Sequence, residues 1–220
     1  NGIPDGTKLE DSGLTGIYTA VINMKKGSYD DLEIGYNGKT FKFGKINVNE
    51  DKAVTFYFDP VSELFYCNAS GAEVKTENIS YDSRNPACKS VYGAVATGQS
   101  VKFTITTGTD VTAAKLVMKG VDTRNIDMKK DGEAVNGKQQ WSVTTKFDTI
   151  GENHYYFALL SGTYMTIYAD DDGNYGKGMV TDLTNVKPYD LVVYKDGFET
   201  PDWMKNAVIY QIFPDRFYNG

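Results

Sequence analysis

Short stretches of alternating apolar and polar residues recur along most of this chain and are separated by turn residues. Apolar side chains occupy every second position in Ala53–Phe58 and Val101–Ile105. The pair Asn37-Gly38 stands between two such stretches and is typical of a tight hairpin turn. Alternation with a period of two indicates half-buried strands, and the helical period of about 3.6 residues is almost absent. We therefore predict an all-β protein.

The predicted strands fall into two groups that flank the polar stretch 71–78. We expect two tandem immunoglobulin-like β-sandwich domains, at residues 1–72 and 73–199, followed by a short segment at 200–220. No strict sequence repeat relates the two groups. Strands of the first group are expected at residues 17–23, 29–36, 40–43, 53–58 and 64–68. Those of the second are expected at residues 101–105, 114–119, 140–147, 155–160, 163–169 and 191–194.

The last residues of the sequence show a different pattern from the alternating strands. Ala207–Phe213 is an almost unbroken apolar run, typical of a strand that is covered on both faces of an α/β sheet. The sequence offers this run no neighbouring strands of the same kind. We therefore expect residues 207–220 to lie against the second sandwich or against another copy of the chain.

Composition and charge narrow the classes of partner. The chain has 220 residues, of which 40% are hydrophobic, with 16 Tyr and 11 Phe, as expected for a folded β-protein. A net charge of −6 argues against a nucleic-acid partner. No apolar run approaches the roughly 20 residues of a membrane helix, so we expect no membrane span.

The sequence offers little catalytic chemistry. His154 is the only histidine, and we expect it at a strand edge rather than in a catalytic site. Cys67 and Cys88 are too few for a disulfide framework or a zinc site, although they could form one bridge or remain two thiols. No nucleophile motif or phosphate-binding loop is present. We expect no catalytic residues and no required cofactor.

The densest group of acids is the run from Asp170 to Asp172, followed by Gly173 and Asn174. Three carboxylates before a glycine could hold a calcium ion, but the run lacks the spacing of a helix–loop–helix calcium loop. A solvated turn is the alternative interpretation. The same acids, Asp171 in particular, could accept hydrogen bonds from sugar hydroxyls, and nearby Lys177 could donate them.

Tyrosines are the other candidates for binding. In one predicted strand Met165 and Ile167 share a face that we expect to be the core, so Tyr164 and Tyr168 are expected to point outward. Tyr175 follows in the acidic turn. Exposed tyrosines beside acids suit a neutral, hydroxyl-rich ligand, although they could instead face water or a neighbouring domain. Trp141 alternates with core positions, so we expect a core role and keep it as a weaker binding candidate.

Several motifs resemble those of known families. Phe198–Trp203 and Lys205–Phe217 resemble the start of the catalytic barrel in glycoside hydrolase family 13, closest to its neopullulanase, pullulanase and amylopullulanase branch. Residues 79–197 resemble a starch-binding module of carbohydrate-binding-module family 34, and residues 14–67 resemble the small sandwiches found upstream in pullulanases. The motifs that carry the resemblance of residues 79–197 are Tyr81–Arg84, Tyr92–Val95, Tyr155–Phe157, Tyr168–Asp172, Gly176–Gly178 and Leu191–Tyr194. Those of residues 14–67 are Gly27–Tyr29 and Val54–Asp59.

The resemblance implies a function by context. It implies a non-catalytic module that binds starch, pullulan or maltooligosaccharides for a secreted or surface-attached bacterial enzyme, with that enzyme's catalytic barrel as its partner. By the same resemblance, residues 200–220 are a linker and the first barrel strand. The alternative is a structural spacer or dimerisation module that binds no sugar. The residues expected to bind substrate are Tyr164, Tyr168, Tyr175, Trp141, Asp171 and Lys177.

Overall fold

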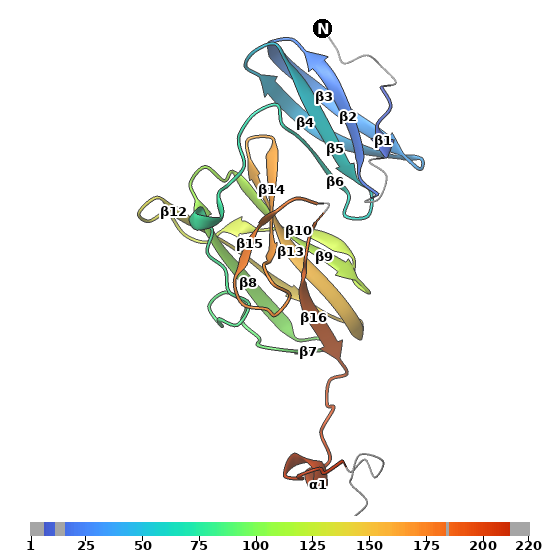
Figure 1. Cartoon of the computed structure of the whole chain (residues 1–220), viewed down its shortest axis with the longest axis vertical. Helices are drawn as coiled ribbons and strands as arrows, with labels where there is room; N and C mark the ends of the chain where they lie inside the picture. The colour runs from blue at the N-terminus through green and yellow to red at the C-terminus, as the bar shows by residue number, and fades with distance from the viewer. Residues whose placement is uncertain (1–6, 12–15, 184, 212–220) are drawn as a thin grey trace, which may run out of the picture.

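The computed structural model describes residues 7–11, 16–183 and 185–211. Sixteen β-strands, one short 3-10 turn (Thr76–Asn78) and one four-residue helix make up its regular structure. The all-β prediction is therefore confirmed over the described residues. Figure 1 shows two strand-rich bodies, which we call the N-terminal module (β1–β6) and the C-terminal module (β7–β16), and an extension that follows β16.

The N-terminal module consists of a four-stranded sheet, in the order β1-β2-β5-β6, and the β3–β4 hairpin. Asn37 and Gly38, at φ 48° and 76°, form the predicted turn of that hairpin. Side chains from both parts, among them Ile46, Val54 and Phe56, are buried together. The strands are β1 (Glu10–Asp11), β2 (Tyr18–Met24), β3 (Gly27–Tyr36), β4 (Lys39–Val48), β5 (Lys52–Asp59) and β6 (Leu64–Cys67).

The C-terminal module has a seven-stranded and a three-stranded sheet, with a shared core between them. The larger sheet runs β10-β9-β13-β14-β15, with β16 beside β13 and β7 beside β16; the smaller runs β11-β12-β8. An immunoglobulin-like strand order stays a prediction. The strands are β7 (Val95–Ala96), β8 (Ser100–Gly108), β9 (Ala113–Gly120), β10 (Arg124–Asp127), β11 (Lys129–Lys130), β12 (Lys138–Lys146), β13 (Gly151–Ser161), β14 (Tyr164–Asp170), β15 (Gly178–Thr181) and β16 (Tyr189–Tyr194).

Trp141 lies in the core of the C-terminal module, with Cys88 packed against that core, and Cys67 lies in the core of the N-terminal module. Trp141 is 3% exposed and donates its indole N–H to the Thr107 hydroxyl at 3.1 Å, so the expected core role is confirmed. Cys67 is buried, Cys88 is half-buried, and both are free thiols. The alternative of two unpaired thiols therefore holds in this structure.

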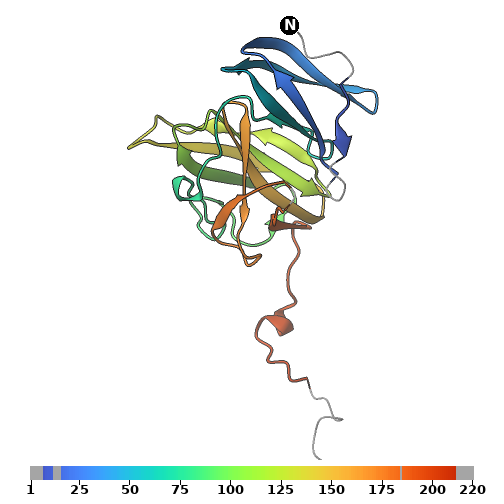
Figure 2. The ribbon, with the colours of Figure 1, turned by 45° about the horizontal axis from the view of Figure 1, so that its top comes forward.

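The two modules meet at an apolar contact that we call the junction. Leu64 and Tyr66 from β6 pack there against Tyr156, Met165 and Ile167 of the C-terminal module. Figure 2 shows the modules in contact from a second direction. Met165 and Ile167 therefore bury their face in the junction rather than in the core of their own module.

The other face of β14 is buried in the core of the C-terminal module. Tyr168, predicted to point outward, is 2% exposed and lies in the core of the C-terminal module, where its hydroxyl accepts the Gly178 N–H at 3.0 Å. Both faces of this strand are covered, so its apolar face did not identify an exposed opposite face. Tyr164, at the start of the strand, is half-buried.

The C-terminal extension leaves the end of β16 and runs away from both modules (Figures 1 and 2). It contains the short helix α1 (Asp202–Lys205), and residues 207–211 form no strand. Val208 and Tyr210 are 79% and 85% exposed, so the expectation that this run lies against the second module is wrong for residues 207–211. The remainder of the predicted barrel strand lies outside the described residues. None of the helices in the described part of the chain has the length and apolarity to cross a bilayer.

Candidate functional site

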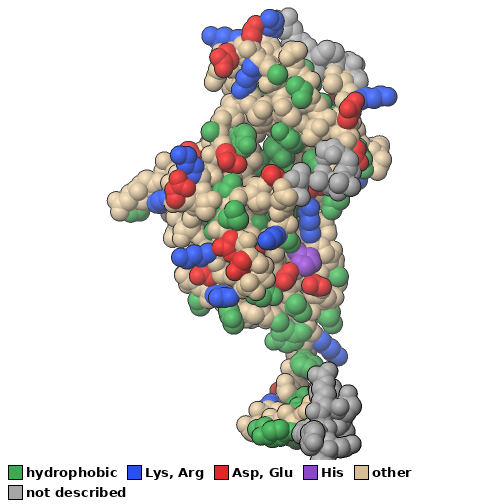
Figure 3. Space-filling model, viewed as in Figure 1, with side chains coloured by type: hydrophobic (Ala, Val, Ile, Leu, Met, Phe, Trp, Pro, Cys, Tyr) green, Lys and Arg blue, Asp and Glu red, His purple; other side chains and the backbone are tan. Residues whose placement is uncertain are grey.

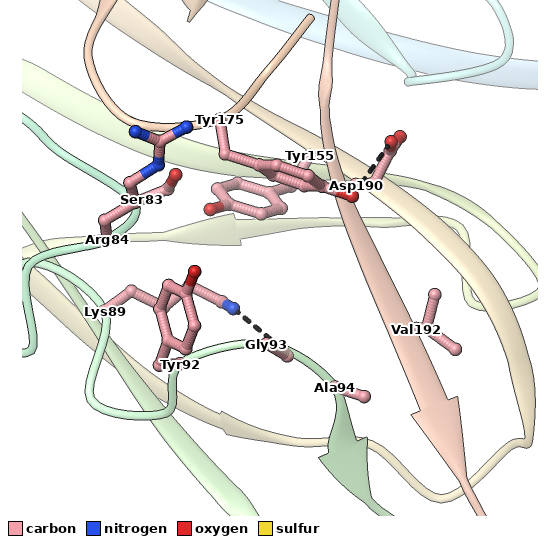
Figure 4. A pocket seen from close by; sticks show the side chains of 10 residues that line it. All are labelled: Ser83, Arg84, Lys89, Tyr92, Gly93, Ala94, Tyr155, Tyr175, Asp190 and Val192. Atoms are coloured by element: carbon pink, nitrogen blue, oxygen red, sulfur yellow. Dashed lines mark hydrogen bonds between the residues drawn. The ribbon is translucent and has the colours of Figure 1, made fainter. Parts of the chain in front are cut away.

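A pocket of about 200 Å³ opens on the C-terminal module. Four separate segments line it (Figure 4): the loop that contains Arg84, Lys89 and Tyr92, strand β13 with Tyr155, the acidic turn with Tyr175, and strand β16 with Asp190. Together these segments bring cationic, carboxylate and aromatic groups to one cavity. The pocket is therefore a product of the fold rather than of a local motif.

Two tyrosine rings flank the opening. Tyr175 is 47% exposed and Tyr92 is 71% exposed. Figure 4 shows them on two sides of the cavity, with the buried Tyr155 behind. Aromatic faces at such an opening can stack on the apolar face of a flat ligand.

The acidic turn is held by Asp170, whose side chain is buried. One of its carboxylate oxygens accepts the N–H groups of Asp172 and Gly173 at 3.3 and 3.2 Å, and the other accepts the Tyr175 N–H at 3.0 Å. These bonds fix Tyr175, at φ 65°, beside the pocket. Oxygens of Asp170, Asp171 and Asp172 lie close enough together for one cation. Their backbone hydrogen bonds already explain the turn, and calcium binding stays a prediction.

The loop at residues 83 and 84 clamps the same turn from the other side. The Ser83 hydroxyl accepts the Gly176 N–H at 2.7 Å, and the Arg84 guanidinium donates to the Asn174 carbonyl at 2.6 Å. Two segments about 90 residues apart in sequence are thereby tied together. The pocket walls are consequently held in place before a ligand arrives.

Lys89 places a buried ammonium group in the pocket. Its residue is 4% exposed, and its Nζ donates to the Gly93 carbonyl at 3.2 Å. Burial away from water lowers the pKa of Lys89 below its usual value. Because an ammonium group has three donors and one goes to Gly93, two are left for a ligand.

Asp190 supplies the acceptor of the site. Its carboxylate lies 2.7 Å from His154 Nδ1 and accepts the Tyr175 hydroxyl at 3.5 Å. His154 and Asp190 are direct partners across β13 and β16. In Figure 3 the single histidine appears on the surface next to acidic side chains. His154 therefore positions an acid. It lies within β13, with Lys119 of β9 on one side and Asp190 of β16 on the other, so the expected position at a strand edge is wrong.

The predicted binding residues are dispersed in the structure. Of the six, only Tyr175 lines this pocket; Asp171 and Lys177 are exposed in the turn beside it. Tyr168 and Trp141 are buried and present no free ring face. Tyr164 lies at the junction, in a different cavity.

Lys89, Tyr92 and Asp190 are among the pocket residues for which the sequence predicted no binding role. Lys89 follows a half-buried cysteine in a loop without periodicity, and Asp190 is one polar position of an ordinary strand. Tyr92 belongs to one of the family motifs, which by itself predicts no binding role. A tyrosine directly before a glycine in a polar loop was the one local signal available.

The comparisons with known proteins agree with the C-terminal motif. An amylopullulanase of Thermoanaerobacter thermohydrosulfuricus is 32% identical over 234 residues, covering 96% of this chain and 16% of that protein. Another, from Thermoanaerobacterium thermosulfurigenes, is also 32% identical, with 96% and 12% covered. The chain matches a region of amylopullulanases. It spans 12–16% of the length of these curated relatives, and the resemblance to this type of enzyme is confirmed at that level.

Other comparisons add less. A solved cyclomaltodextrinase structure is 20% identical, with 66% of this chain and 24% of that chain covered and a TM-score of 0.39. This likeness is too weak to establish the fold. No protein-family model matches the chain. The identities of the separate modules stay predictions.

Proposed function

We propose that this chain is a non-catalytic region of a starch-degrading enzyme and that its pocket binds a glucosyl unit of an α-glucan. The similarity to amylopullulanases supports the substrate class. The pocket supports the binding role. We further propose that the full enzyme is secreted or attached to the cell surface, where such polymers are met.

The observation that carries this proposal is the buried Lys89 ammonium between two exposed tyrosine rings. A glucosyl ring would stack its apolar face on Tyr175 or Tyr92, while its hydroxyls accept hydrogen bonds from Lys89 and donate to Asp190. Arg84 adds a charged donor at the rim. This combination of apolar surface with a few convergent polar groups is typical of small-ligand sites.

Binding is favoured over hydrolysis by the carboxylates of the pocket. Glycoside hydrolysis generally requires two carboxyl groups on either side of the scissile bond. Asp190 is the one carboxylate among the lining residues, and it is engaged by His154. The site would therefore hold a glucan near the catalytic barrel and raise its local concentration there.

Calorimetric titration with maltoheptaose tests the pocket. Tyr175→Ala and Tyr92→Ala are each expected to weaken binding about tenfold, or about 1.4 kcal/mol, because a stacking surface is lost. Tyr194→Ala is the matched control, since Tyr194 is an exposed tyrosine of β16 that does not line the pocket. Equal affinities of the Tyr175→Ala variant and the control would contradict the assignment.

A second candidate function is a rigid spacer that positions the barrel or mediates dimerisation. The junction favours it, because the two modules are joined by an apolar contact and by hydrogen bonds. The same titration separates the two functions. A spacer gives no heat with maltoheptaose and no retention in a starch gel, whereas a binding module gives both.

A further inference from the structure

A second cavity, of about 100 Å³, lies at the junction. Both modules contribute to it: Tyr57 and Tyr66 come from β5 and β6, and Tyr164 comes from β14. In Figure 3, hydrophobic side chains gather where the two modules meet. The volume is below the usual ~300–1,000 Å³ of an enclosing ligand pocket. A cavity of this size suits a single sugar ring that lies on its surface rather than one that is enclosed.

The tyrosines of this cavity form an aromatic platform. Tyr57 and Tyr66 are cross-strand partners whose rings stack at 4.7 Å with an interplanar angle of 8°. All three tyrosines are half-buried, so their side chains are partly shielded from water and still partly accessible to a ligand. Burial, then the Glu73 carboxylate and Tyr57, raises the pKa of Tyr164, as expected where these groups are neighbours.

Polar groups border the platform. Asn68 lines the cavity, and its side-chain oxygen accepts the Thr55 N–H at 2.9 Å, so its amide nitrogen is not used in that bond. Glu73 is exposed and lines the same cavity with a carboxylate. Aromatic faces bordered by an amide and a carboxylate match the apolar faces and hydroxyl edges of a sugar ring.

The platform is held in place by backbone contacts between the modules. The Ser70 carbonyl accepts the N–H groups of Thr163 and Tyr164, both at 3.1 Å, and Cys67 N–H donates to the Thr163 carbonyl at 3.3 Å. The Thr163 hydroxyl also accepts the Ser70 N–H at 2.9 Å. A ligand would thus meet tyrosines whose backbones are already fixed, which lowers the entropy lost on binding.

We propose that the junction cavity is a second carbohydrate-binding site, with Tyr57, Tyr66 and Tyr164 as its stacking surface and one glucosyl unit of an α-glucan as its ligand. The ligand class rests on the proposed function, whereas the location is independent of it. The site is complete only when the two modules are in contact. Two sites on one chain would engage a polymer more strongly than a short oligosaccharide, because the second binding event is intramolecular.

An NMR titration of the isotope-labelled full chain with maltotriose tests this proposal. Two separate sets of amide shifts are expected, one around Tyr92, Tyr175 and Asp190 and the other around Tyr66 and Tyr164. Tyr164→Ala is expected to weaken binding at the junction set about tenfold and leave the pocket set unchanged. Glu73→Ala, at an exposed residue that carries little structural risk, is expected to weaken the same set severalfold.

The outcomes separate the two proposals. Shifts confined to the pocket set overturn the junction site and leave the pocket standing. Shifts confined to the junction set, lost in Tyr164→Ala and kept in a Tyr92→Ala/Tyr175→Ala double variant, support the junction site and contradict the pocket. No shifts in either set overturn both. Shifts at the junction that neither Tyr164→Ala nor Glu73→Ala reduces, with thermal unfolding unchanged, contradict the assigned platform.

Discussion

At the residue scale, Lys89 combines a positive charge with almost complete burial. Removing an ammonium group from water is costly, and one carbonyl acceptor compensates only part of that cost. The lowered pKa of Lys89 expresses the same penalty. We therefore expect Lys89 to lower the free energy of unfolding. We expect it to raise the affinity for a sugar, because ligand hydroxyl oxygens would accept the hydrogen bonds of the ammonium group that no protein acceptor takes.

Lys89→Met should therefore separate stability from binding. Methionine keeps a similar length without the charge, so we expect a variant that is as stable as the parent or more stable by about 1–2 kcal/mol, with maltoheptaose affinity reduced about tenfold. Chemical denaturation and calorimetry measure the two quantities. A clear loss of both stability and binding would show that Lys89 supports the loop rather than the ligand.

The pH dependence of that stability difference follows from the sign of the shift. Because the folded-state pKa lies below the usual 10.5, the folded protein binds the proton less tightly than the unfolded chain does. The penalty is fully present at neutral pH and disappears as the pH rises from the folded-state pKa toward 10.5. The difference between Lys89→Met and the parent should shrink over that range.

At the scale of single elements, the turn that follows β6 determines how the modules join. Gly71 has φ 83°, and a Cβ atom placed on it would overlap the carbonyl oxygen of Ser161. The turn at Gly162, with φ 62°, faces the same segment, so two glycine turns approach each other backbone to backbone. This approach lets Ser70 bond Thr163 and Tyr164 and aligns β6 with β14.

Gly71→Ala should be much more costly than the same change at a free turn. In Gly38→Ala the left-handed conformation alone is strained, at about 1–2 kcal/mol, because nothing lies near the added Cβ. Gly71→Ala adds a backbone clash, so we expect a larger loss of unfolding free energy and weaker binding at the junction cavity. Denaturant titrations of both variants measure this. Equal losses would contradict the close approach.

At the scale of the whole molecule, the junction couples two modules that share no strand pairing among the described residues. Apolar packing is supplemented there by polar contacts. The Ser62 hydroxyl lies 3.1 Å from the Tyr156 hydroxyl, Lys119 pairs with Asp59 at 3.3 Å, and Asn125 donates to the Ser62 carbonyl. Asp59 and Tyr156 are buried, whereas Lys119 is partly exposed, so these contacts are partly shielded from water. We infer that the modules behave as one cooperative unit.

Leu64→Ala tests this coupling. Leu64 is 3% exposed and belongs to the junction cluster, so its truncation should cost about 2–5 kcal/mol. The parent chain should unfold in one calorimetric transition, and the variant should show two because the modules separate. Val21→Ala, at a 66% exposed position of β2, is the matched control. Two transitions already in the parent would contradict the cooperative unit.

Much of the fold could be predicted from the sequence, and less of the site. Alternation in β5 and β8 predicted these strands because side chains on a strand point to opposite faces. The same rule was wrong for Tyr168, because β14 is covered on one face by its own core and on the other by the N-terminal module. The acidic turn indicated Tyr175 as an exposed candidate, but no local pattern indicated Lys89 or Asp190, whose surroundings depend on distant segments.

The sequence by itself determined the β-strands, the hairpin turn at Asn37 and Gly38, and the relationship to amylopullulanases, because each of these depends on neighbouring residues or on a contiguous motif. Only the tertiary structure decided which tyrosines are accessible. It buries Tyr168, places Tyr175 beside Lys89, and brings Tyr164 to Tyr57. Burial and proximity arise from contacts between segments far apart in the chain, and no local pattern encodes these contacts.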